Sequence, residues 1–228
     1  IRKLAGPWLP ELPSYLTLQQ IVQPNMFNGE GWGQNEGLRI PVGIFDYPQM
    51  QKQNVLYMDL QAQGHYGIYG APGTGKTTLL KTVVTSLAQS YTPEEVNCYV
   101  IDCGGRSMAA LADLPHVGDV VLDFQEEKLR KLCQLLEHQI DVRKDAMFRR
   151  TKPSYGMFIQ QEAKNQPAIV LVIDNVGAVL QNYPYMEQFL IQLSGEGSTY
   201  GIHLVYTARN SNDVRYKICR NVRGAIAF

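Results

Sequence analysis

Apolar and polar residues follow one another along the chain in a pattern that predicts strands and helices in turn. From His65 onwards we expect strands at 65–69, 98–102, 168–173, 202–207 and 224–228. Helices are expected between them at about 75–90, 126–149, 185–195 and 213–219. The runs 169–173 and 202–206 are continuously apolar, which is typical of strands buried on both faces. The alternation predicts an α/β protein with a mostly parallel sheet and helices on both faces.

The long helix predicted at 126–149 has one apolar stripe. Leu129, Leu132, Leu136 and Ile140 recur at intervals of three and four residues, with Glu, Lys and Arg between them. This spacing predicts that the leucines and the isoleucine face the core and that the charged residues face solvent.

The first part of the chain lacks such periodicity. Residues 1–37 are rich in Pro, Gly, Gln and Asn, and we interpret them as a linker or wrapping arm. Two short strands are expected at 38–45 and 55–60, separated by a polar turn, which predicts an antiparallel pair leading into the core. We therefore expect a single domain at 38–228.

Composition narrows the class of protein. The 228 residues are 45% hydrophobic, enough for one sizeable core. Lys plus Arg equals Asp plus Glu at 21 each, so no overall charge favours DNA. The sequence shows neither a run of about 18 apolar residues nor a signal-peptide pattern, and we expect a soluble chain. The four cysteines form no C-x-x-C pair and are expected to be free thiols in a reducing compartment.

A glycine-rich motif follows the strand expected at 65–69. Residues 70–77, GAPGTGKT, match G-x-x-x-x-G-K-[ST], with an expected strand before and an expected helix after. Such a loop directs backbone N–H groups and a helix N-terminus at phosphates, while Lys76 reaches the β- and γ-phosphates and Thr77 ligates Mg²⁺. The alternative is a simple turn before a helix. We expect the following residues to bind ATP: Gly70, Ala71, Pro72, Gly73, Thr74, Gly75, Lys76, Thr77 and Thr78.

The second half of an ATP site needs an acidic residue at the end of a buried strand. Asp174 follows the run 169–173, and we predict that it holds Mg²⁺ together with Thr77. The alternative is a turn aspartate that caps the next helix. The next residue is Asn175, whose amide cannot take a proton from water at neutral pH, whereas hydrolytic enzymes of this class often have Glu there. The sequence therefore predicts nucleotide binding with little hydrolysis.

Other polar and aromatic residues are less specific. Asp102 ends an expected strand and either faces the phosphate site or caps the turn that follows. The four histidines have no metal-ligand spacing, and we expect them to be structural. Tyr183, Tyr185 and Phe189 are expected to fill the core or an interface and not to stack on bases.

Several further segments resemble one family. They are WLPELP at 8–13, IPVGI at 40–44, YVIDCGG at 99–105, LPHVG at 114–118 and GIHLV at 201–205. With the phosphate loop, they resemble the FtsK/SpoIIIE-type motor ATPases, and among these the ATPase domains of the type VII secretion proteins EssC and EccC. The resemblance implies a RecA-like P-loop fold, ATP and Mg²⁺ as ligands, and a cytoplasmic domain of a membrane-anchored protein. It also implies neighbouring ATPase domains in the same chain, a ring or homo-oligomer such as a hexamer, and small helical Trp-Xaa-Gly secretion substrates.

The chain departs from this family's pattern in two places. Asn175 replaces an acidic residue, and the segment TARN at 207–210 stands where DNA translocases resemble Ala-Thr-Gln-Arg, so that Arg209 replaces a sensor glutamine. Both positions are expected to assist hydrolysis. The later, degenerate domains of EssC-like proteins are similar in this respect, which implies that this chain is the last or next-to-last ATPase module. The resemblance also implies a missing C-terminal piece, because relatives continue beyond Phe228.

Three functions remain open from the sequence. The leading one is an ATP-binding module, weakly hydrolytic or inactive, that docks substrate and regulates a linked secretion motor; its partners do not include DNA. The others are a competent DNA translocase subunit and a small-molecule P-loop kinase, which should carry a basic channel and an arginine-rich lid respectively. A ring ATPase also takes an arginine from its neighbour, and the sequence does not choose among the candidates Arg149, Arg150, Arg209, Arg215, Arg220 and Arg223.

Overall fold

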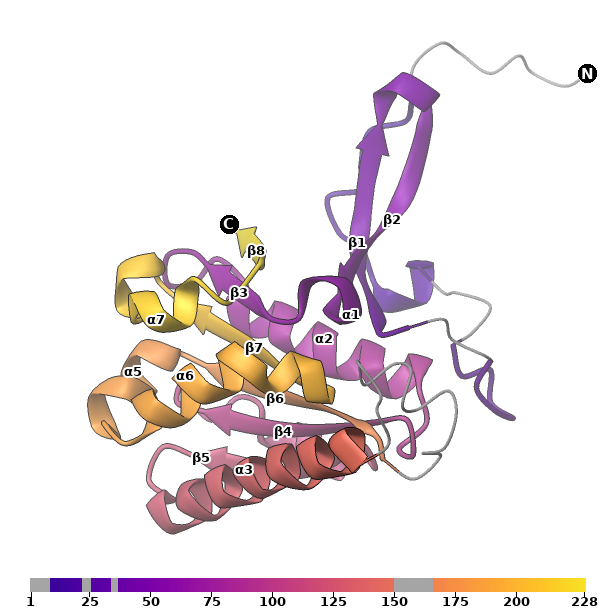
Figure 1. Ribbon diagram of the computed structural model, residues 1–228. Coiled ribbons are helices and arrows are strands. Elements are labelled where there is room, and N and C mark those ends of the chain that lie inside the picture. Colours follow the sequence, from indigo (N-terminus) through magenta and orange to yellow (C-terminus); the bar gives the residue numbers. More distant parts are fainter. Residues whose placement is uncertain (1–8, 22–25, 34–36, 150–165) are drawn as a thin grey trace, which may run out of the picture.

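A parallel sheet with helices on both faces forms the body of the molecule (Figure 1). The computed structural model describes residues 9–21, 26–33, 37–149 and 166–228. The strands of the sheet lie in the order β5-β4-β6-β7-β3-β8, and every adjacent pair is parallel. Their bounds are β3 (Tyr66–Tyr69), β4 (Val96–Asp102), β5 (Val117–Leu122), β6 (Ala168–Asp174), β7 (Ile202–Ala208) and β8 (Gly224–Ala227). The predicted α/β class with a parallel sheet is confirmed.

The two central strands are buried along their whole length. Every residue of β6 and of β7 is buried, because helices cover both faces of the sheet there. Successive side chains alternate between the two faces, so that Val170 and Val172 join one hydrophobic cluster while Ile169 and Leu171 join the other. The continuous apolar runs in the sequence therefore reflect burial on two sides.

Helices are divided between the two faces. α2 (Lys76–Ser90) packs on one face, where Leu80, Val83 and Leu87 are fully buried. The other face is covered by four helices, and the two longest of them lie in front of the sheet in Figure 1. They are α3 (Glu126–Arg149), α5 (Val176–Asn182), α6 (Met186–Glu196) and α7 (Tyr216–Cys219). The stripe predicted on α3 is confirmed, since its four apolar members are buried.

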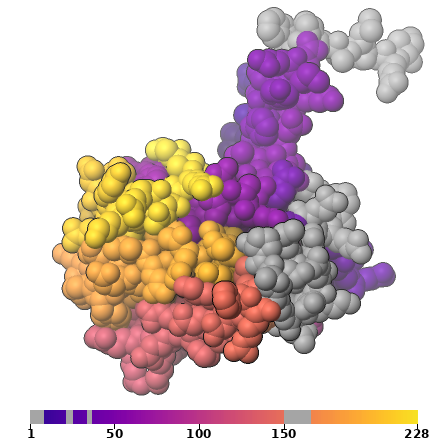
Figure 2. All heavy atoms as spheres, viewed as in Figure 1, coloured from indigo at the N-terminus to yellow at the C-terminus, as the bar shows by residue number. Residues whose placement is uncertain are grey.

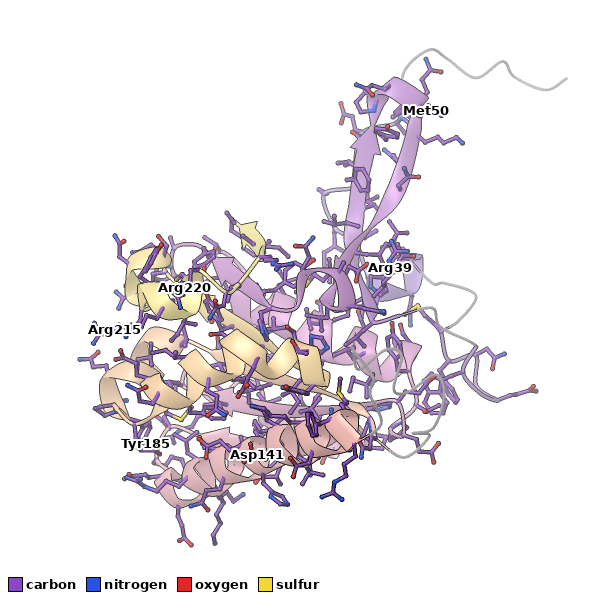
Figure 3. All side chains as sticks on the ribbon, viewed as in Figure 1. Arg39, Met50, Asp141, Tyr185, Arg215 and Arg220 are labelled. Carbon is purple, nitrogen blue, oxygen red and sulfur yellow. The ribbon has the colours of Figure 1, made fainter. Side chains whose placement is uncertain are left out.

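A two-stranded hairpin stands out from this body (Figures 1 and 2). Its strands are β1 (Arg39–Tyr47) and β2 (Lys52–Asp59), which pair antiparallel as predicted. Met50 lies at the tip and Arg39 near the base (Figure 3). The strands are longer and their turn is shorter than predicted, because mixed polar residues near the tip continue the ladder in spite of their composition.

The base of the hairpin belongs to the core, which therefore begins before His65. Ile40 and Met58 are buried in the same cluster as α2, and Leu60 starts the short helix α1 (Leu60–Gln63) instead of ending a strand. Part of the N-terminal arm lies against the end of α2. There, the Trp32 indole Nε1 donates a hydrogen bond to the Ala88 carbonyl at 3.1 Å.

The body also contains a strand and a helix that were not predicted, and one helix is shorter than predicted. β5 forms at one edge of the sheet, and α5 fills part of the interval before α6. The helix expected at 213–219 is reduced to α7, because residues Ser211–Asp213 form a separate 3-10 turn. Among the described residues, no helix is long and apolar enough to cross a membrane.

Candidate functional site

The glycine-rich loop connects β3 to α2 at the carboxyl edge of the sheet. Gly73 and Gly75 have φ angles of 82° and 100°, in the left-handed region that favours glycine. At Gly70 the reason is space, because an added Cβ would lie 2.7 Å from the Thr74 hydroxyl and 3.1 Å from the Phe228 Cβ. Two different constraints thus explain the three glycines of the motif.

The N-terminus of α2 points its free backbone N–H groups into this loop. The helix is 15 residues long, and its N-cap residue, Gly75, supplies no side-chain cap. The first-turn N–H groups at Lys76, Thr77 and Thr78 lie at the positive end of the helix dipole, where anions are stabilised. This local structure suits a phosphate group.

Lys76 lies over the loop. Its ammonium Nζ donates hydrogen bonds to the carbonyl oxygens of Gly70 at 2.7 Å and Ala71 at 2.8 Å. The charge is therefore held at the mouth of the loop, where it can exchange carbonyl partners for phosphate oxygens.

Asp174 lies beside the loop, as the sequence predicted. The Thr77 hydroxyl donates to Asp174 Oδ2 at 2.8 Å, although 97 residues separate the two in the chain. β6 and the loop meet because the carboxyl ends of parallel strands share one edge of the sheet. Asp174 is only 2% exposed. It does not cap α5, so the alternative role considered for it is wrong.

The pair of Thr77 and Asp174 fits a magnesium ion. Hydroxyl and carboxylate oxygens are hard ligands, and Mg²⁺ usually takes one or two protein ligands together with phosphate oxygens and water. Within the described residues, no group of three or more His, Cys, Asp or Glu side chains could enclose a metal ion. The arrangement therefore suits a cation that arrives with its nucleotide.

Asp102 occupies the neighbouring strand end and is used for turn formation. Its carboxylate accepts from the backbone N–H groups of Gly104 at 3.1 Å, Arg106 at 3.2 Å and Met108 at 2.9 Å. Asp102 is fully buried. Of the two roles considered for this residue, the structure supports turn capping.

Gly104 also belongs to the site, although its place in the sequence does not predict this role. A Cβ on Gly104 would lie 2.6 Å from Asp174 Cγ, so the turn after β4 fits against the carboxylate only without a side chain. The Gly-Gly pair after Asp102 was visible in the sequence, but its contact with Asp174 requires the pairing of β4 with β6.

Replacing Gly104 with alanine is expected to disturb the site. Asp174 is buried and held by a hydroxyl on each oxygen, so it cannot swing away at low cost. We expect the free energy of unfolding to fall by about 1–3 kcal/mol. Chemical denaturation measures this loss. The control is Gly43→Ala, where an added Cβ has no atom within 4 Å; equal stability losses in both variants would contradict the steric explanation.

Asn175 has a structural role in the turn after β6. Its backbone is left-handed, with φ 62° and ψ 65°, and its side-chain oxygen accepts from the Ala178 N–H at 3.4 Å as the N-cap of α5. Asparagine adopts a left-handed backbone and serves as an N-cap more readily than most residues, whereas glutamate is favoured in neither role. The amide is therefore directed to the helix end, and its expected part in hydrolysis remains a prediction.

Arg209 lies near the site but is exposed. It follows β7, and its side chain is 69% exposed and pairs with Asp213 at 3.7 Å. Together with Asn175 and Gln181 it lines a small polar cleft of about 150 Å³. The sensor role expected at this position remains a prediction.

The candidate arginines are distributed over both edges of the sheet. Arg149 ends α3 and Arg223 precedes β8, which places both at the amino edge, away from the phosphate loop of their own chain. Arg215 pairs with Glu187 at 3.0 Å and lies with Arg220 on the α7 side of the molecule (Figure 3). Arg150 falls outside the described residues.

Two buried histidines form hydrogen bonds between the amino ends of β3 and β7. His65 Nδ1 accepts from the Leu204 N–H at 2.9 Å, and His203 Nδ1 donates to the Gly64 carbonyl at 2.7 Å. Burial lowers the pKa of His65 to about 3, with His203 as a further cause, and burial lowers the pKa of His203 to about 4. Both rings are neutral at pH 7, and their role is structural as expected.

Two tyrosines make a similar connection nearer the loop. The hydroxyl groups of Tyr69 and Tyr206 are 2.7 Å apart, and burial raises the pKa of both phenols. Phe189 is buried in the core, as predicted. The Tyr185 ring stacks against Arg130, whose guanidinium carbon Cζ lies 4.1 Å from the ring centroid.

Comparison with known proteins supports the family that these features suggest. The FtsK/SpoIIIE family model matches residues 34–227. The ESX secretion system protein EccC of Thermomonospora curvata is 32% identical over 238 residues, an alignment that covers 96% of this chain and 18% of the relative. The type VII secretion system protein EssC of Staphylococcus aureus is 25% identical, covering 100% of this chain and 16% of the relative.

Solved structures give the same result. The T. curvata EccC structure containing ATPases 2 and 3, in complex with a signal sequence peptide, has a TM-score of 0.86 and 30% identity. The match covers 96% of this chain and 42% of the chain in the EccC structure. The present chain spans less than a fifth of the length of these curated relatives. From the phosphate loop, the topology and these matches, we conclude that the chain belongs to the FtsK/SpoIIIE family.

Proposed function

We propose that this chain is an ATP-binding module of a type VII protein secretion motor, with weak hydrolytic activity or none. In this proposal the module is a cytoplasmic domain of a membrane-anchored protein, where it docks substrate and regulates the linked ATPase domains. The similarity to EccC and EssC supports the secretion system. The site geometry supports binding without efficient turnover.

One observation carries the proposal. The residues expected to form the phosphate cradle lie together, with Lys76 at its mouth and Thr77 bonded to Asp174, whereas the next residue, Asn175, offers an amide that caps a helix. Binding and hydrolysis depend on different groups in this site. A chain can therefore retain the first function when it loses the second, because loss of a general base costs about 10²–10⁴ in rate.

Each residue has a definite part in nucleotide binding. The loop and first-turn N–H groups would donate hydrogen bonds to phosphate oxygens, and the Lys76 ammonium would offset phosphate charge. Thr77 and Asp174 would hold the Mg²⁺, which supplies positive charge between the phosphates. The buried position of Asp174 keeps its carboxylate fixed relative to the loop.

The partners of this chain are inferred from its similarity to the relatives and are part of the proposal. The T. curvata EccC structure contains two ATPase domains and a signal sequence peptide. By analogy, we propose neighbouring ATPase domains of the same parent chain, a ring assembly, and small helical secretion substrates as partners. A DNA translocase is less well supported, since the chain has no net charge.

The test is to measure binding and turnover on the same sample. In an isothermal titration with ATP and Mg²⁺ we expect saturable binding to the 228-residue chain. In a phosphate-release assay we expect a rate below the roughly 1–10³ s⁻¹ typical of enzymes.

Both possible failures are informative. Turnover within the enzymatic range would show that another group activates water, and would favour an active motor. No binding at millimolar ATP would mean that the loop is vestigial and would refute the proposal.

A further inference from the structure

The Thr207 hydroxyl makes two contacts that bear on the site. Thr207 lies on β7, next to β6, and is 1% exposed. Its Oγ1 is 2.6 Å from Asp174 Oδ1 and 2.7 Å from the backbone N of Asn175. A backbone N–H can only donate, so Thr207 Oγ1 accepts that hydrogen bond. Its single proton is therefore free to donate to Asp174.

The two carboxylate oxygens of Asp174 are thus held separately. Oδ1 receives the Thr207 hydroxyl, and Oδ2 receives the Thr77 hydroxyl of the phosphate loop. Gly104 packs against the carboxylate from the turn after β4. This arrangement leaves Asp174 one orientation, in which Oδ2 faces the loop.

We propose that Thr207 is the positioning residue that orients Asp174 toward the Mg²⁺ of bound ATP. The inference rests on the proposed function, because it concerns the metal that accompanies the nucleotide. Residues that orient a metal ligand commonly change metal affinity or activity by about 10- to 100-fold when they are replaced.

The variant that tests the inference is Thr207→Val, which keeps the shape of the side chain but removes the hydroxyl. The measurement is the ATP affinity with excess Mg²⁺ and again with EDTA. We expect the affinity gain due to Mg²⁺ to fall about 10-fold or more. The affinity in EDTA should stay within about twofold, because the loop and Lys76 are unchanged.

Two further variants separate positioning from general stability. Thr207→Ser keeps the hydroxyl and should restore the Mg²⁺ effect. Ser86→Ala removes another buried hydroxyl, which donates to the Pro41 carbonyl at 2.9 Å away from the site, and should leave the Mg²⁺ effect unchanged. If Thr207→Val does not fold, Thr207→Ala provides the same loss of hydroxyl with room for a water molecule.

The outcomes distinguish this inference from the proposed function. Failure of the wild-type chain to bind ATP would overturn both. Wild-type binding with a Mg²⁺ effect that Thr207→Val leaves intact would overturn the positioning role alone. An equal loss of affinity in Mg²⁺ and in EDTA would also overturn it, because that result indicates general damage to the site.

Discussion

Replacing Lys76 with alanine is expected to weaken ATP binding by roughly 30-fold or more, because loss of a desolvated charge partner costs about 2–5 kcal/mol. In the free protein, the Lys76 ammonium is held by two loop carbonyls at 2.7 and 2.8 Å. These carbonyls can turn to water when the ammonium is removed. The fold should therefore survive, with a change in the free energy of unfolding of about 1 kcal/mol or less.

The matched control is Lys81→Ala on the same helix. Lys81 is five residues further along α2, about 7.5 Å from Lys76 along the helix axis, and its loss changes the net charge of the chain equally. Titration calorimetry should show wild-type affinity for Lys81→Ala. Equal losses in the two variants would mean that only general charge attracts the nucleotide. Wild-type affinity in Lys76→Ala would show that the nucleotide binds outside the loop.

Acidification is expected to destabilise the protein through His65 and His203. Both have a lowered pKa in the folded state, about 3 and about 4, while an exposed histidine has a pKa of about 6.5. Below pH 6.5 the unfolded chain therefore binds protons that the folded chain cannot, so stability falls with falling pH until the folded pKa is reached. Each histidine contributes a slope of about 1.4 kcal/mol per pH unit.

Together the two histidines should lower the free energy of unfolding by about 3 kcal/mol between pH 6.5 and pH 5, a large part of the 5–15 kcal/mol of an ordinary domain. Denaturant unfolding at several pH values measures the slope. His65→Asn and His203→Asn can keep a hydrogen bond without titrating, and each should reduce the slope by about half. His138→Asn replaces an exposed histidine and should leave it unchanged. A wild-type stability that does not change between pH 7 and pH 5 would refute this account.

The features predicted best from sequence were those with a strong local pattern. The apolar runs of β6 and β7 need burial on both sides, and the phosphate loop is defined by residue types at fixed spacing. The contact between the end of β6 and the phosphate loop also followed from the parallel topology, since Thr77 and Asp174 both lie at the carboxyl edge. The roles of these residues in ATP and Mg²⁺ binding remain predictions.

The features that escaped prediction depend on contacts between strands. β5 contains Gly118 and Asp119, which interrupt its apolar pattern, and the ring of Tyr99 on β4 covers the glycine. α5 is short, and its N-cap residue, Asn175, has a positive φ that no propensity indicates. The contact of Thr207 with Asp174 likewise exists only because β6 and β7 are neighbours.

The position of β3 has a consequence for the order in which the molecule assembles. Gly67 pairs with Tyr206 on one side and with Ala225 on the other, so both neighbours of β3 come from the last part of the chain. The linked side chains of Tyr69 and Tyr206 are 137 residues apart. Contacts over such separations form slowly, because a long loop must close first. During synthesis on the ribosome, the phosphate loop emerges before β7 and β8, the two strands that pair with β3. A chain interrupted before β8 therefore leaves β3, the strand that leads into this loop, at an open edge of the sheet.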